Sequence, residues 1–297
     1  MIMQRPSSVQ RSLPRALAGL LIAVMAVWLI PALVLTPAAA AVLEGAHVLE
    51  LTAASMGRIT ALQADQKLWI YPYGSEGEPT QVDETVTYLM PERFRSDLVS
   101  EHIQRTHLVF ANHSLTVIDG RMTVVSNPFD RYQELLRSRS RPRLIRTLNR
   151  LGVQTAISSL GRLEGQVVYV LGARYPDESA SQLAVDQATF LPLRLLLLLN
   201  PDSDSAPRRL EIFYREWRKV ENGWFPMQVV FYTDGRLARE IRVADLRSNP
   251  PIPADLLDLE ALKRSVSLQE ALSPREQKTE TVETLQQQLR DFQKKFE

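Results

Sequence analysis

The side chains that could do chemistry in this chain are few and scattered. Its four histidines are His47, His102, His107 and His113. His102 and His107 are five residues apart in a region expected to be a strand, where an odd spacing places two side chains on opposite faces. No group of histidines and acids has the spacing of metal ligands. The sequence therefore predicts neither a metal site nor a cofactor.

Candidate nucleophiles and acid pairs are equally isolated. Ser158-Ser159 lacks the Gly-x-Ser-x-Gly context of a nucleophile elbow, and no glycine-rich phosphate loop occurs. The acid pairs Glu76/Glu78 and Asp202/Asp204 lie in turn-rich stretches, where charged side chains are mostly solvated. With no catalytic residue in view, the sequence predicts a binding protein or carrier and not an enzyme.

A dense basic run is the strongest charge feature of the chain. It contains five arginines and no acid: Arg137, Arg139, Arg141, Arg143 and Arg146. Such a run is consistent with a solvated loop and helix face. It is also consistent with contact to anionic lipid headgroups, where each basic residue contributes up to ~1 kcal/mol. Arg141 and Arg143 are the headgroup or lid candidates in this run.

The N-terminal segment predicts export. Three arginines precede an apolar run from Ala16 to Leu35, which small residues follow up to Ala41. This order is typical of a cleavable secretory signal peptide over residues 1–41. The apolar run also has about the ~20 residues of a transmembrane helix. The alternative is thus a protein anchored in the inner membrane and facing the periplasm.

The cysteine count and the net charge indicate the cellular compartment and the kinds of partner more closely. The chain has no cysteine, which excludes a disulfide framework and a lipidated N-terminal cysteine. An exported chain of this kind fits the bacterial periplasm. Without residues 1–41 the formal net charge changes from +1 to −2, with 32 bases against 34 acids. A near-neutral chain gives no indication of nucleic-acid binding.

Aromatic and leucine side chains on predicted strands are candidates to line a lipid cavity, although ordinary core packing explains them equally well. Alternation places Leu195 and Leu197 on one face of an apolar strand, opposite Arg194 and Leu196. A strand that is apolar on both faces lies between two apolar layers. The cavity candidates are Trp69, Tyr71, Tyr88, Phe94, Phe110, Leu195, Leu197, Phe213, Trp217 and Phe231.

The elements that would position these residues are mostly strands. An amphipathic helix is expected over Val42–Met56 and ends at Gly57. Alternating runs then predict strands, and Asp119-Gly120, Asn222-Gly223 and Asp234-Gly235 predict tight hairpin turns. The expected strands are 67–73, 80–89, 93–99, 106–111, 115–119, 121–126, 166–173, 181–186, 192–199, 208–220, 227–233 and 237–244.

Helices are expected to interrupt the strands and to end the chain. The middle of the chain predicts helices over 130–136 and 143–151, and a further helical turn over 155–160. Near the end, 255–263 predicts a short helix. The polar tail that follows, with apolar residues at helical spacing from residue 273 on, is either a solvated appendage or a docking helix for a protein partner. We therefore expect a domain over 42–263 and a helical tail over 264–297.

Four segments resemble the LolA-like outer-membrane lipoprotein carrier and lipoprotein-sorting family. Asp186–Pro192 resembles the family's strand with a Leu-Pro step, and Tyr214–Pro226 its hairpin with Trp-Phe-Pro. Val243–Pro253 resembles its terminal strand and proline-rich exit, and Met90–Arg95 its early Pro-containing step. The resemblance extends over about Val42–Leu262.

The resemblance implies an α+β fold, an incomplete antiparallel β-barrel (a half-barrel) covered by helices, with an N-terminal helix and a polar C-terminal helical tail. It also implies a periplasmic, chaperone-like carrier that shields lipid or lipoprotein acyl chains and exchanges them between inner-membrane donor and outer-membrane acceptor complexes. Family members carry a basic lid residue before the early proline, where this chain has Met90; Arg93 and Arg95 are the candidates to replace it. The alternative is a regulatory or scaffold protein of the same fold that senses lipoproteins or binds a protein partner through the C-terminal helix.

Overall fold

The computed structural model describes residues 42–72, 77–101, 103–123, 127–199 and 207–272, with side chains up to residue 267. The chain divides into two units at residue 41, and the second unit begins at Val42. The predicted signal segment, residues 1–41, and the tail from residue 273 lie outside the described residues. The architecture below is therefore that of the second unit.

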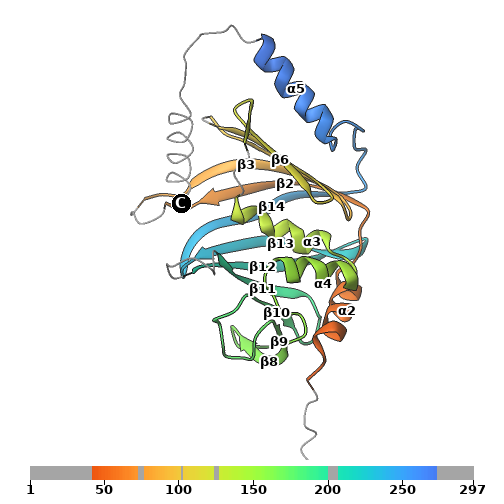
Figure 1. The fold of residues 1–297 in the computed structure, drawn as a ribbon, viewed down its shortest axis with the longest axis vertical. Helices are drawn as coiled ribbons and strands as arrows, with labels where there is room; N and C mark the ends of the chain where they lie inside the picture. Colours follow the sequence, from red (N-terminus) through yellow and green to blue (C-terminus); the bar gives the residue numbers. More distant parts are fainter. Residues whose placement is uncertain (1–41, 73–76, 102, 124–126, 200–206, 273–297) are drawn as a thin grey trace, which may run out of the picture. The chain divides into compact units, whose positions relative to one another are not determined.

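One antiparallel sheet forms the framework of this unit (Figure 1). Its order, β7-β6-β5-β4-β3-β2-β14-β13-β12-β11-β10-β9-β8, leaves two unpaired ends among the described residues, so the sheet is open. Short β1 pairs with β13 outside this path. The strands are β1 (Gly57–Arg58), β2 (Ala61–Ile70), β3 (Thr80–Leu89), β4 (Arg93–Val99), β5 (Gln104–Phe110), β6 (His113–Ile118), β7 (Arg121–Thr123), β8 (Ser158–Leu163), β9 (Gln166–Leu171), β10 (Gln182–Asp186), β11 (Pro192–Leu199), β12 (Arg208–Val220), β13 (Asn222–Thr233) and β14 (Arg236–Ser248).

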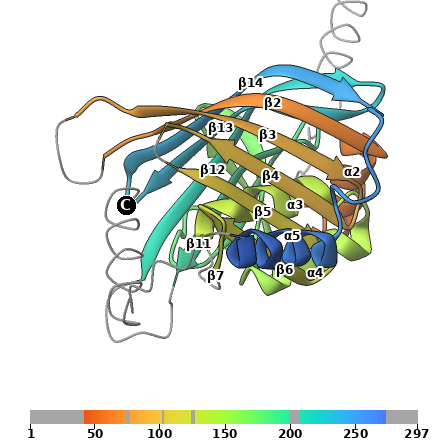
Figure 2. The same ribbon diagram turned by 90° about the horizontal axis from the view of Figure 1, so that it is seen from above.

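Helices cover the concave inner face of the sheet. They are α2 (Gly45–Met56), the 3-10 helix η1 (Pro128–Arg131), α3 (Tyr132–Arg137) and α4 (Arg141–Arg150). Figure 2 shows the sheet arching over α3 and α4. Their apolar side chains join those of the inner face in one core cluster. The predicted open half-barrel covered by helices is confirmed.

Helix α5 (Leu259–Leu272) lies on the other side of the sheet, against β5 and β6. Leu108 of β5 and Val117 of β6 point outward and are buried, as is Val266 of α5. This outer layer is separate from the main core cluster. The boundary expected between domain and tail, at residues 263 and 264, falls inside α5.

Two of the three predicted hairpin turns have the expected geometry. Asp119-Gly120 and Asp234-Gly235 both have positive φ at each residue, as a type I′ turn requires. The third prediction was off by one residue, because Glu221 has the positive φ and Gly223 already pairs with Val220. An added Cβ on Gly223 would lie 2.8 Å from the Met56 carbonyl oxygen. This glycine therefore permits the close approach of β1, and does not form the turn.

Two segments differ from the prediction more strongly. The helical turn expected over 155–160 is wrong, since strand β8 begins at Ser158 and pairs with β9. Tertiary pairing overrides the weak local preference there. Strand β2 begins at Ala61, six residues before the expected start, and its buried Leu62 and Ala64 extend the inner face.

Candidate functional site

The inner face of the half-barrel is lined by apolar side chains from strands far apart in sequence. Tyr88 of β3 and Phe94 of β4 are fully buried, with ring centroids 4.8 Å apart. The Tyr88 ring also meets Phe225 of β13 at 5.7 Å. Leu195 and Leu197 of β11 continue the wall toward the other end of the sheet. Alternation along each strand produces this wall, because every second side chain faces inward.

The segment η1–α3–α4, residues 128–150, fills the space in front of this wall, and we call it the cover. Phe129 and Tyr132 pack edge-on against Phe231 of β13, at centroid distances of 5.7 and 5.8 Å. Four leucines of the cover are completely buried against the inner face: Leu135, Leu136, Leu144 and Leu148. The cover is thus held mainly by apolar burial, which stabilises by ~1.5–3 kcal/mol for each such side chain.

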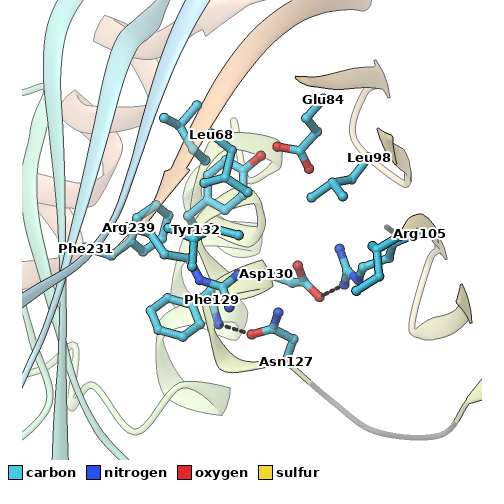
Figure 3. Close-up of a pocket in the computed structure, with 13 residues that line it drawn as sticks. Leu68, Glu84, Leu98, Arg105, Asn127, Phe129, Asp130, Tyr132, Phe231 and Arg239 are labelled. Carbon is cyan, nitrogen blue, oxygen red and sulfur yellow. Dashed lines mark hydrogen bonds and ion pairs between the residues drawn. The ribbon is translucent and has the colours of Figure 1, made fainter. Parts of the chain in front are cut away.

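A small cavity of about 40 Å³ remains between η1 and the inner face (Figure 3). Its apolar lining comes from Leu68, Ile70 and Ile241 of the sheet, with Phe129 of the cover. A wider, more open groove of about 650 Å³ runs between β5, β6 and α3. Both spaces border the same helix, so they would merge if the cover moved away from the sheet.

One side of the cavity carries buried charge. Glu84 of β3 accepts hydrogen bonds from Gln66 Nε2 at 2.6 Å and from Ser96 Oγ at 2.5 Å. Burial raises the pKa of Glu84, although these two bonds oppose the shift. Arg105 of β5 forms an ion pair with Asp130 of η1, and both side chains are largely buried. This pair joins the cover to the sheet beside the apolar wall.

A histidine stands next to this ion pair. The Nδ1 atom of His107 lies 2.8 Å from Thr116 Oγ1, and its Nε2 atom lies 3.9 Å from the Asp130 carboxylate. Burial lowers the pKa of His107, and this outweighs the attraction of Asp130. The imidazole is therefore neutral at neutral pH.

Two arginines of the cover donate hydrogen bonds to backbone carbonyls in other parts of the fold. Arg137 donates to the Glu92 carbonyl at 3.1 Å. Arg139 donates to the carbonyls of Met56 at 2.5 Å and of Trp224 at 3.0 Å. Burial lowers the pKa of Arg139 to about 10, so the side chain is charged at neutral pH. The two Arg139 bonds fix the turn between α3 and α4 at the place where α2, β1 and β13 meet.

The predicted cavity residues divide between the two faces of the sheet. Tyr88, Phe94, Leu195, Leu197 and Phe231 belong to the inner core cluster, and Trp217 packs against it beside Tyr214. The other four lie away from the cover: Trp69 and Tyr71 near Arg242 and Glu240, Phe213 against Tyr232, and Phe110 exposed near α5. The structure brings only the first group together.

The predicted lid and headgroup arginines occupy outer or surface positions. The Arg95 guanidinium bonds the Asp97 carboxylate and the Leu256 carbonyl, on the outer face. Arg93 stacks over the Phe110 ring at 4.7 Å. Neither of these contacts involves the cover. Arg141 pairs with Glu50 of α2, and Arg143 with Glu92 at 2.9 Å.

Sequence reasoning missed the polar residues of the site. Arg137 and Arg139 were seen only as members of a basic run. Glu84 fell in an expected strand, Arg105 just before one and Asp130 at the start of an expected helix, and none of them was proposed as a site residue. Glu84 and Arg105 carry a usable signal, because alternation places them on the same strand faces as Val86 and His107. The pairing of Arg105 with Asp130 depends on the position of η1, which no local pattern gives.

Two properties of the described residues bear on function. They contain no group of three or more His, Cys, Asp or Glu side chains that could hold a metal ion. None of their helices is long and apolar enough to cross a bilayer.

Comparison with known proteins supports the fold alone. No protein-family model and no curated protein matches the chain. A solved domain from Vibrio parahaemolyticus, described as belonging to an outer membrane lipoprotein-sorting protein, matches with TM-score 0.51 and 12% identity over 74% of this chain and 98% of that chain. A DUF1329 family protein from Desulfovibrio piger matches with TM-score 0.50 and 13% identity, over 73% and 97%. The resemblance to lipoprotein-sorting proteins is thus confirmed at the level of the fold.

Proposed function

We propose that this chain is a binding protein that shields acyl chains of a lipid or lipoprotein against the inner face of the half-barrel, and that it is not an enzyme. One observation carries this proposal: the cover buries four leucines on a continuous apolar wall. Movement of the cover would uncover a concave apolar surface without unpairing any strand. Such a surface suits an acyl chain, because each buried methylene stabilises by ~0.8 kcal/mol.

Among the described residues, the space enclosed between η1 and the inner face has no room for an acyl chain in the closed state. The cavity of about 40 Å³ has space for water-sized groups only. Binding therefore requires the cover to move, with the groove beside α3 as the opening through which a chain enters. The cover is suited to move because side-chain contacts and arginine-to-carbonyl bonds hold it, while the sheet holds itself through its ladder.

We further propose that the protein acts in the periplasm, where the segment 1–41 would direct it. Donor and acceptor complexes in the two membranes would then load and unload the acyl chains. The fold of the Vibrio domain, described for lipoprotein sorting, is consistent with this role.

The test is lipid uptake by the purified chain from Val42 onward. Native mass spectrometry after purification from a membrane-containing lysate, followed by organic extraction, would detect a stoichiometric lipid or lipopeptide. Uptake of added diacyl lipid would then be compared between Phe231→Ala and Phe213→Ala. These two residues lie on paired strands but on opposite faces of the sheet.

We expect Phe231→Ala to change the affinity several-fold and Phe213→Ala to leave it unchanged. A chain that carries no lipid and takes up none would overturn the proposal. The alternative, a regulatory or scaffold protein that binds a protein partner, would then be the better explanation.

A further inference from the structure

The cavity in Figure 3 has an unusual charge arrangement for an acyl-chain site. Arg105 is 7% exposed and lines the cavity together with Arg239. The Arg239 guanidinium lies 3.9 Å from the Phe129 ring centroid, and the charges of Arg105 and Asp130 both act on it. In Figure 3 the Asp130 carboxylate lies between the two guanidinium groups. The anion that pairs with Arg105 in this structure thus belongs to the cover.

The remaining acid of the cavity has hydrogen-bond partners of its own on the sheet. Glu84 is bonded to Gln66 and Ser96, on the side of the cavity away from η1. Burial raises its pKa and so disfavours its charged form. His107 faces the same ion pair, but burial favours its neutral form. Arg105 is therefore the cation that loses its carboxylate partner when Asp130 leaves.

We propose that the ligand is an acyl lipid with a carboxylate or phosphate headgroup, which takes the place of the Asp130 carboxylate on Arg105 and so releases the cover. This rests on the proposed acyl-chain function of the inner face. Headgroup exchange leaves no buried charge unpaired at Arg105, because one anion replaces another. A neutral headgroup offers no such replacement, and opening the cover would then leave a buried guanidinium without its partner, which is costly.

The geometry also explains why the site would recognise the headgroup and the acyl chain of one ligand together. Arg105 and Asp130 border the cavity whose apolar walls include Leu68, Ile70 and Ile241. A ligand with its anion on Arg105 would extend its chain along this apolar wall, in the place of Phe129. A free anion could satisfy Arg105 but could not cover the wall that the departing aromatic ring exposes.

The experiment compares oleate, oleyl alcohol and inorganic phosphate by titration calorimetry and competition with a fluorescent fatty acid, on the chain from Val42 onward. We expect oleate to bind at least about tenfold more tightly than oleyl alcohol, and phosphate not to compete at oleate concentrations. Asp130→Asn removes the internal competitor and should tighten oleate binding several-fold. Asp97→Asn is the matched control, because Asp97 pairs with Arg95 on the outer face, and it should not change oleate binding.

Arg105→Gln alone would leave Asp130 unpaired and could unfold the protein, so the double variant Arg105→Gln/Asp130→Asn is the decisive one. It should bind oleate and oleyl alcohol equally. Equal binding of both ligands by the unmodified chain, or a preference that survives in the double variant, would overturn the headgroup inference but leave the acyl-chain proposal standing. Competition by phosphate at oleate concentrations would assign the site to a free anion. Failure of both oleate and oleyl alcohol to bind would overturn the acyl-chain proposal itself.

Discussion

Replacing Arg139 by methionine should loosen the cover more than any other single arginine replacement in the basic run. The Arg139 guanidinium donates to the carbonyls of Met56 and Trp224, which belong to the end of α2 and the start of β13. Hydrogen bonds from a charged donor contribute ~1.5–3 kcal/mol each, and a buried acceptor left unpaired costs ~1–3 kcal/mol. Methionine keeps much of the length and the apolar contacts of the side chain but donates no hydrogen bond.

The cost of desolvating the guanidinium offsets part of the stabilisation that these two hydrogen bonds provide. Burial lowers the pKa of Arg139 to about 10, which shows that the charged form is disfavoured where it lies. The net loss of unfolding free energy on Arg139→Met should therefore be about 2 kcal/mol, below the sum of the individual bonds. The matched control is Arg143→Met, since Arg143 is 35% exposed and pairs with the half-exposed Glu92. An exposed pair of this kind contributes ~0.2–1 kcal/mol.

Urea unfolding followed by tryptophan fluorescence would measure both variants. Amide hydrogen exchange over 132–150 would show whether the loss is local to the cover. We expect Arg139→Met to speed exchange in the cover while β2, β3 and β14 stay protected. Equal losses in the two variants, or no loss in Arg139→Met, would refute the argument that carbonyl ties hold the cover.

Three further perturbations test other parts of the structure. Glu84→Gln should raise the unfolding free energy at neutral pH, because burial raises the folded-state pKa of Glu84. The unmodified protein then loses stability as the pH rises from the unfolded to the folded pKa of this group, by ~1.4 kcal/mol for each pH unit that separates the two values. A pH profile of stability that Glu84→Gln leaves unchanged would contradict this. Gly223→Ala should cost ~1–3 kcal/mol in urea unfolding because its Cβ would meet the Met56 carbonyl and Ile59 at 2.8 Å; a neutral effect would show that β1 can shift. Leu136→Ala should cost ~2–5 kcal/mol as a fully buried leucine of the cover, and a loss below that range would mean that the cover contributes little to stability.

The sequence was informative where side chains alternate over a long strand. The bounds of β3, β4, β11 and β12 were predicted to the residue, because each has a clear alternation or a continuous apolar run between turn signals. Leu195 and Leu197 fall on the inner face for the same reason. The secondary structure of short or weakly patterned segments was harder to predict. One example is β8, which becomes a strand only through its pairing with β9.

Which face of the sheet is the inner one could not be predicted from aromatic content. Trp69 and Tyr71 looked like cavity residues by type, yet Leu68 and Ile70, which alternate with them, point inward. An outward aromatic is stabilised instead by a cation, as Arg242 stacks over Trp69 at 5.8 Å. Residue type gives the alternation, but only the position of the helices decides which of the two faces is covered.

The same inner wall cannot serve the cover and a ligand at once, and this competition sets how the protein would work as a carrier. Burying four leucines stabilises the closed cover by roughly 6–12 kcal/mol, and burying a long acyl chain of about fifteen methylenes would contribute a similar amount, about 12 kcal/mol. Because the two apolar terms are of similar size, polar ties of a few kcal/mol contribute to the choice between the closed and the loaded state. Weakening Arg139 or removing Asp130 should therefore each favour loading of acyl chains, because each change removes a polar tie of the closed cover. A carrier needs this balance, since a cover that closed much more weakly would not release its ligand.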